Sequence, residues 1–193
     1  TMSLPILSAT TYSVTKPYFD VAYLPTLPDG RFYRLNYPGP GGSGDITVGV
    51  QTFNGGPQFG DTANTSLQAT ITAADRGDID GDSLDDLAVT TSDGFVFVLI
   101  NNGGNGTFSQ AIQLPVGTSP RGVRLVDLDP DNPNANGLDI VVTNSGDDTA
   151  TVYSRTGAGV WFVAAALALG DDPRGVAFDD FDGEANNVAG GAT

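Results

Sequence analysis

The sequence has no cysteine and no histidine, and it has a single lysine and a single glutamate. Without cysteine there are no disulfides, no thiolate metal sites and no thiol nucleophiles. Without histidine, Ser-His-Asp triads and histidine-ligated zinc or iron are excluded, and the usual general base is missing. An extracellular protein of this composition needs another means of stabilising its fold, and a bound metal ion is one such means.

Long hydrophobic runs are also lacking, because the longest, residues 160–169, is half of the roughly 20 residues needed for a membrane span. No signal peptide is visible, and a start at Thr1 and Met2 is consistent with processing or trimming. No helical period of 3.6 persists. Apolar residues make up 39% and charged residues 16%, with 26 glycines and 12 prolines among 193 residues, which favours a folded all-β protein with many turns.

The net charge is −15, which argues against nucleic acid or an anionic membrane as a partner. The acidity comes from 22 aspartates and one glutamate, against seven arginines and one lysine. Fifteen of the aspartates fall in three clusters, at residues 75–86, 127–139 and 171–182. A surface that is acidic only for solubility would scatter these charges and would use glutamate as freely, so the clusters need their own explanation.

A repeat organises the chain. LPVGTSPRGVRLVDLD (114–129) matches LALGDDPRGVAFDDFD (167–182), 53 residues later, and the acidic loop at Asp78 precedes the one at Asp127 by 49. A weaker match pairs FNGGPQF (53–59) with NNGGNGTF (101–108). Each period of about 50 residues contains four stretches rich in β-branched and aromatic residues, separated by turns with glycine or asparagine.

Four antiparallel strands in each period predict a β-propeller-like array of about three four-stranded blades. We expect the blades at residues 30–76, 77–126 and 127–179, with a partial repeat at 180–193. The residues expected in the sheet core include Val96, Phe97, Val98, Trp161 and Phe162. Arg121 and Arg174 recur in Pro-Arg-Gly and are expected to make one structural pairing in each blade.

Residues 1–29 belong to no repeat and are extended in character, so we interpret them as an N-terminal extension and a possible donor strand. About three blades would leave two open sheet edges, which a protein must manage. Two interpretations stay open. The spare strand pairs with an open edge, within the chain or between chains, or the sequence is a piece of a longer protein.

The stretch GDIDGDSLDDL (77–87) has the ligand spacing of a calcium loop. Positions 1, 3, 5 and 9 carry carboxylates and position 7 offers a backbone carbonyl, so the predicted ligands are Asp78, Asp80, Asp82, Leu84 and Asp86. Gly81 allows the tight turn. An EF-hand would place a helical glutamate at position 12, where this chain has Val89 in a strand-like stretch. Mg²⁺ is less suitable, because it prefers water-rich octahedral sites with few carboxylates.

DIDGDSLDDLAV (78–89) followed by FVLINNGGNGTF (97–108) resembles the FG-GAP and VCBS-type repeats of secreted and cell-surface proteins, which are related to the integrin α-chain propeller. The resemblance covers roughly residues 45–188 and is specific over 74–130. It implies a Ca²⁺ site in the Asp-x-Asp-x-Asp-Gly-x-x-Asp loop of a blade. Ser83 stands where this family usually has a glycine.

Two further loops are candidate Ca²⁺ sites. The second keeps its first three aspartates in register, and four extra residues precede the expected closing ligand, giving Asp127, Asp129, Asp131 and Asp139. Asn134 or Asn136 could add an oxygen. The third loop carries Asp180, Asp182 and Glu184 but ends in Val188, so it is degenerate or is completed by another chain. The alternative for every loop is a solvated Asp/Gly turn.

We expect no enzymatic activity, because loops of this spacing surround the ion with protein oxygens and leave little room for chemistry. The sequence favours an extracellular or cell-surface calcium-binding protein with a structural role. The specific hypothesis is a filament or scaffold subunit that assembles head to tail, residues 3–15 adding a strand to an open edge after Val188 of the next copy. The alternative is an adhesion or carbohydrate-binding module from a larger secreted protein. Expected partners are copies of itself, other cell-surface proteins or glycans, with no nucleic acid and no membrane insertion.

Overall fold

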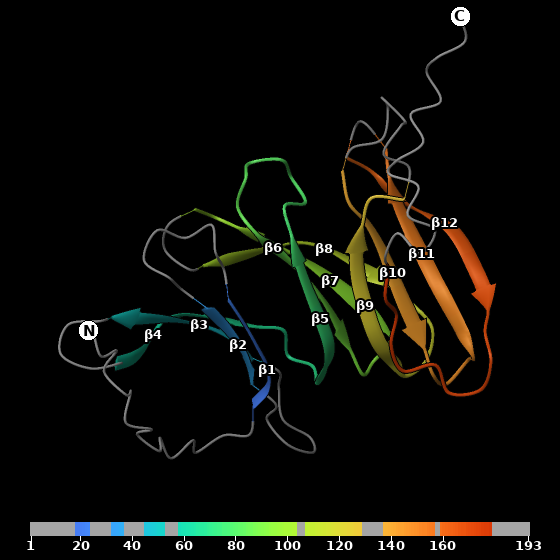
Figure 1. Cartoon of the computed structure of the whole chain (residues 1–193), viewed down its shortest axis with the longest axis horizontal. Coiled ribbons are helices and arrows are strands. Elements are labelled where there is room, and N and C mark those ends of the chain that lie inside the picture. Colours follow the sequence, from blue (N-terminus) through green and yellow to red (C-terminus); the bar gives the residue numbers. More distant parts are fainter. Residues whose placement is uncertain are drawn as a thin grey trace, which may run out of the picture.

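The structure is a computed structural model, which describes residues 18–23, 32–36, 45–52, 58–103, 107–128, 137–156 and 159–178 (Figure 1). Every helix or strand in these ranges is a β-strand, and the twelve strands form three four-stranded antiparallel sheets. The predicted all-β class is therefore confirmed. The part of the chain that the structure describes has no helix that is long and apolar enough to cross a membrane.

Each sheet is a meander in which strands follow one another in chain order. The first sheet consists of β1 (Tyr18–Tyr23), β2 (Phe32–Asn36), β3 (Asp45–Thr52) and β4 (Gln58–Ser66). The second consists of β5 (Ile71–Gly77), β6 (Asp86–Thr91), β7 (Phe95–Asn101) and β8 (Phe108–Pro115). The third consists of β9 (Pro120–Val126), β10 (Asp139–Asn144), β11 (Thr149–Arg155) and β12 (Trp161–Ala168). Tight turns join β6 to β7 and β10 to β11, and Gly94 and Asp148 provide the left-handed backbone (φ +86° and +55°) that these two turns require.

The grouping of strands differs from the expected repeat units by one strand. The first and second acidic loops each connect the first and second strands of one sheet, so the strand before the loop pairs with the strand after it. As a result β9, expected at the end of the unit 77–126, starts the third sheet. Residues 18–23, expected in the extension 1–29, form β1 and pair with β2. The proposed donor segment 3–15 and the partial repeat 180–193 lie outside the described residues.

The second and third sheets repeat one another in detail. Asp86 pairs with Gly77 in the ladder between β5 and β6, and Asp139 pairs with Val126 at the matching position between β9 and β10. Both sheets also have a register irregularity between their third and fourth strands, at Val98/Leu99 and at Val152/Tyr153. The internal repeat in the sequence therefore corresponds to a repeat in strand register.

Alternation along the strands produces two core clusters. Leu87 and Val89 of β6 belong to a cluster that also contains Leu67, while Ala88 between them belongs to a second cluster with Val142 of β10. This second cluster packs the second sheet against the third. The first strands of successive sheets lie side by side, since β1 contacts β5 and β5 contacts β9 (Figure 1).

The expected core residues are partly confirmed. Val96, Phe97 and Val98 are buried, and Trp161 is half-buried against the second cluster. Phe162 is 46% exposed, so its assignment to the core was wrong. The reason is its place on β12, which is the outermost strand of the third sheet and has mostly exposed side chains.

Candidate metal centre

The acidic turn between β5 and β6 brings three of its aspartates together. Ligand oxygens of Asp78, Asp80 and Asp86 all lie within 4.8 Å of one another. Asp78 follows the last residue of β5 and Asp86 begins β6, so the antiparallel pairing of these strands returns the chain to its starting point. Carboxylate oxygens at such separations can share one hard divalent cation.

Asp86 is the buried member of the group, with 0% of its surface exposed. Its Oδ2 accepts hydrogen bonds from the backbone N–H groups of Ile79 at 2.8 Å and Asp80 at 3.3 Å. Its Oδ1 accepts a hydrogen bond from the N–H of Asn101 at 2.8 Å. Asp86 therefore holds the start of the turn against the end of β7 and presents its carboxylate to the centre of the loop.

Burial raises the pKa of Asp86 to about 6. The hydrogen bonds from the N–H groups of Asn101 and Ile79 oppose this increase, whereas the negative charge of Asp80 adds to it. A buried carboxylate beside another carboxylate is costly to ionise, and a cation between them offsets that cost. The three carboxylates could therefore hold a cation.

Asp78 organises the rest of the turn. Its Oδ1 accepts a hydrogen bond from the N–H of Gly81 at 2.7 Å, and its Oδ2 accepts one from the N–H of Ser83 at 2.9 Å. Both residues are left-handed, with φ of +87° at Gly81 and +71° at Ser83. The value at Ser83 explains why a glycine is usual there in the family that the sequence resembles, since only glycine adopts this conformation freely.

Asp82, another predicted ligand, lies outside the group of three carboxylates. It is exposed, and its Oδ1 accepts a hydrogen bond from the N–H of Leu84 at 2.8 Å. The participation of the Asp82 carboxylate and of the Leu84 carbonyl as ligands stays a prediction.

Residues 78–132 match the family model of the FG-GAP-like repeat. This segment is an FG-GAP-like repeat. The match begins at Asp78, the first aspartate of the turn, and ends within the second acidic loop, so the resemblance seen in the sequence is confirmed over these residues. No curated protein matches the chain significantly.

A solved structure named as a 6-phosphogluconolactonase from Bacteroides fragilis is similar to this chain in fold, with a TM-score of 0.62 and 16% sequence identity. The similarity covers 89% of this chain and 44% of that protein, so the chain spans less than half the length of the structure it matches. At this identity the likeness concerns the fold alone and does not decide whether the chain is an enzyme.

The second acidic loop reproduces part of the hydrogen bonding of the first. Asp139 is 3% exposed, and its Oδ2 accepts a hydrogen bond from the N–H of Leu128 at 2.9 Å, as Asp86 does from Ile79. Asp139 is therefore the structural counterpart of Asp86 despite the four inserted residues. Asp127 is exposed, and the remaining predicted ligands lie outside the described residues, namely Asp129, Asp131, Asp180, Asp182 and Glu184.

Two residues that support the turn were not found from the sequence. Asn101 binds Asp86 through its N–H and donates a side-chain hydrogen bond to the carbonyl oxygen of Asp85 at 3.1 Å. Its only signal was its place in NNGG, which had indicated the repeat period. Arg155 of β11 donates a hydrogen bond from Nη1 to the carbonyl oxygen of Ile79, and no local pattern could have indicated this contact between sheets.

Proposed function

We propose that this chain is an extracellular Ca²⁺-binding repeat protein in which the ion has a structural role. The observation that carries the proposal is the convergence of Asp78, Asp80 and Asp86 in one tight turn. Ca²⁺ takes oxygen ligands and tolerates flexible geometry, so carboxylates from a loop suit it better than they suit Mg²⁺. FG-GAP repeats often bind Ca²⁺, and the match over residues 78–132 supports the same ion here.

The chemistry of the donor set fits the ion. Both carboxylate oxygens of Asp78 and Oδ1 of Asp86 accept one backbone N–H hydrogen bond each, so each of them retains a further lone pair for a cation. Asp80, which is exposed, adds a third carboxylate. We propose that Asp82 and the Leu84 carbonyl, which belong to the same turn, complete the shell. When bound, Ca²⁺ would neutralise the repulsion between the carboxylates and fix the β5–β6 connection, which is a stabilising and non-catalytic role.

The three sheets support a β-propeller-type array of blades. Each is a four-stranded meander, and the first strand of each lies beside the first strand of the next. A blade array of this kind buries the faces between successive sheets, as the cluster around Val96 and Val142 does. We propose that the sheets are successive blades.

Head-to-tail assembly by strand complementation is our second proposal. In the described ranges β12 pairs on one side only, with β11. Apolar side chains along and beside it are exposed, including Val160 at 60% and Val163 at 55%. An apolar strand at the edge of a sheet is a template for pairing with another chain. Deleting residues 1–16 should leave folded, calcium-binding monomers, and persistent assemblies in the truncated protein would contradict the donor-strand mechanism.

Calcium binding is tested by titration and thermal melting of the chain with calcium and with chelator. Calcium should raise the melting temperature of the unaltered protein, because the ion binds the folded turn. Asp80→Asn should weaken binding by at least about tenfold, since one ligand charge is removed from a site whose affinity depends on charge count. Asp93→Asn, in the exposed turn after β6, is the matched control and should leave affinity unchanged. Equal melting with calcium and chelator would overturn the proposal.

A further inference from the structure

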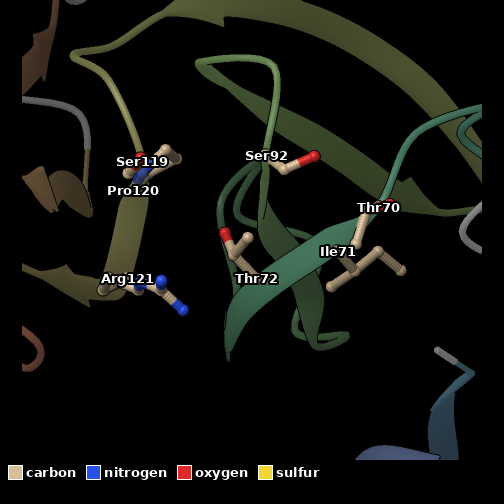
Figure 2. Close-up of a pocket in the computed structure, with 7 residues that line it drawn as sticks. All are labelled: Thr70, Ile71, Thr72, Ser92, Ser119, Pro120 and Arg121. Atoms are coloured by element: carbon tan, nitrogen blue, oxygen red, sulfur yellow. The ribbon is translucent and has the colours of Figure 1, made fainter. Parts of the chain in front are cut away.

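A pocket of about 250 Å³ lies between the second and third sheets, at the end of β5 opposite the acidic turn (Figure 2). The starts of β5 and β9 form two of its walls and the turn after β6 contributes a third. Its lining residues are Thr70, Ile71, Thr72, Ser92, Ser119, Pro120 and Arg121. Four of these seven side chains carry a hydroxyl group, and Arg121 is the only charged one. The pocket is therefore polar, small and positively charged in a protein of net charge −15.

The side chain of Arg121 extends from β9 into the space between β9 and β5 (Figure 2). Four other arginines have described side chains, and each has a polar partner. Arg76 pairs with Asp85, Arg124 with Asp75, Arg174 with Asp172, and Arg155 with the carbonyl oxygen of Ile79. Within the ranges that the structure describes, Arg121 has neither an ion pair nor a side-chain hydrogen bond, so its donors are available to a ligand.

The internal repeat shows what sets Arg121 apart. Arg174 occupies the matching position of the next repeat, and Asp172 occupies the position that matches Ser119. Both turn residues are left-handed, with φ of +50° at Ser119 and +53° at Asp172, so the two turns have nearly the same φ at this position. Asp172 accepts hydrogen bonds from Nε and Nη2 of Arg174 at 2.8 and 2.5 Å. Serine cannot neutralise a guanidinium, and the expectation that Arg121 and Arg174 make the same pairing was wrong.

The walls of the pocket are held in place by backbone hydrogen bonds. The N–H of Ser92 donates to the carbonyl oxygen of Thr70 at 2.8 Å, and the N–H of Ser145 donates to that of Ser119 at 3.0 Å. Thr72 is fixed by a hydrogen bond from its Oγ1 to Oγ1 of Thr90 at 3.0 Å. Ile71, which is 1% exposed, contributes an apolar surface. A preformed pocket loses little entropy when a ligand binds.

We propose that this pocket binds a hydroxylated monocarboxylate of monosaccharide size, such as a hexuronic acid. Arg121 would pair with the carboxylate in the fork geometry that guanidinium groups favour. The hydroxyls of Thr70, Ser92 and Ser119 would exchange hydrogen bonds with hydroxyls of the ligand. A single guanidinium matches a single negative charge, so a phosphate dianion is a poorer fit on this acidic protein. The volume is below that of sites for drug-sized ligands, which fits a molecule the size of one sugar ring. The inference does not depend on the calcium proposal.

The test is titration of the full chain, observed by NMR and calorimetry, with D-galacturonate, D-galactose and inorganic phosphate as probes. Galacturonate should bind at least about tenfold more tightly than galactose, because only galacturonate forms the charge-assisted pair. Oligogalacturonate separates a free sugar acid from a residue within a polysaccharide, since binding at least as tight as that of the monomer would point to the polymer. Arg121→Gln should reduce galacturonate binding by at least about tenfold, and Arg174→Gln is the matched control that should not change it.

A second variant tests the proposal while keeping Arg121 in place. Ser119→Asp introduces the acid that the next repeat has at Asp172, so it should neutralise Arg121 and abolish galacturonate binding while leaving the turn folded. Circular dichroism and melting curves check the fold of each variant. Three results would overturn the proposal: no binding of galacturonate, tighter binding of phosphate, or galacturonate binding that Arg121→Gln and Ser119→Asp leave unchanged.

Discussion

The hydroxyl group of Tyr153 in β11 donates a hydrogen bond to the carbonyl oxygen of Pro115, the last residue of β8, at 2.5 Å. The ring is 3% exposed and belongs to the core cluster shared by the second and third sheets. Tyr153 thus joins these sheets through apolar contacts of its ring and through a hydrogen bond of its hydroxyl group. The hydrogen bond therefore fixes the relative position of the two sheets, and the buried ring adds apolar contact between them.

Tyr153→Phe should lower the free energy of unfolding by roughly 1 kcal/mol, because it keeps the ring and removes one hydrogen bond. Urea denaturation at pH 7 measures this difference. Tyr153→Ala should cost about 3–5 kcal/mol, since it also opens a cavity in the shared cluster. If the two substitutions had the same effect, the ring would contribute nothing beyond its hydroxyl, which contradicts its burial.

Asp86→Ala should destabilise the protein by roughly 2–4 kcal/mol even with chelator present. The substitution leaves the N–H groups of Ile79 and Asn101 without their acceptor in a buried turn. Denaturation with chelator separates this structural contribution from that of the ion. Asp80→Ala is the comparison, because Asp80 is exposed and should cost less than about 1 kcal/mol when no ion is present. If both variants lost the same unfolding free energy in chelator, the hydrogen bonds of Asp86 would not have the structural role expected here.

Ser83→Gly should raise the free energy of unfolding by roughly 0.5–1 kcal/mol. The residue is held at φ +71°, where a side chain is strained and glycine is not. Ser92→Gly serves as the control, because φ of Ser92 is not in this region and glycine there only increases the freedom of the unfolded chain. Thermal melting of both variants in chelator should shift in opposite directions.

Asp147 gives an expected dependence on pH. The hydroxyl and the N–H of Thr118 donate to this carboxylate, at 2.6 Å each, and they lower its pKa below the usual 3.8. A lowered pKa in the folded state contributes stability above the pKa of the unfolded chain, and this contribution is lost as pH falls through the folded value. Asp147→Asn should therefore destabilise the protein at pH 7, and the difference should shrink below about pH 4. A difference that does not change with pH would rule out the carboxylate charge as its cause.

The sequence contained the repeat, the all-β class and the position of the acidic turn, because these depend on local spacing. The alternation of Asp78, Asp80 and Asp86 within nine residues predicts one loop, and antiparallel pairing of the flanking strands closes it. The grouping of strands was harder to predict. The apolar pattern of β9 would be the same at the end of one sheet as at the start of the next. Only its hydrogen bonding to β10 shows that it belongs to the third sheet.

Contacts between residues distant in the chain escaped prediction for the same reason. Arg155 contacts the carbonyl oxygen of Ile79, 76 positions earlier in the chain. Among the described residues the Arg121 guanidinium has no partner, and this difference is apparent only by comparison with the pairing of Arg174 and Asp172. The shared Pro-Arg-Gly motif predicted the same role for Arg121 and Arg174. The residue two positions before each arginine differs, and only the second arginine has an aspartate there. Asp82 has the right spacing and accepts a hydrogen bond from the local backbone, as Asp78 does, and its role as a ligand stays a prediction.

The strand β5 has the acidic turn at one end and the Arg121 pocket at the other, and its seven residues span about 20 Å. This is more than twice the Debye length of about 8 Å at physiological ionic strength, so the charge of a bound cation is largely screened at the pocket. The two proposed sites at the ends of β5 would therefore be electrostatically almost independent of each other. Gain or loss of the cation would change the stability of the second sheet without changing the ligand preference of the Arg121 pocket.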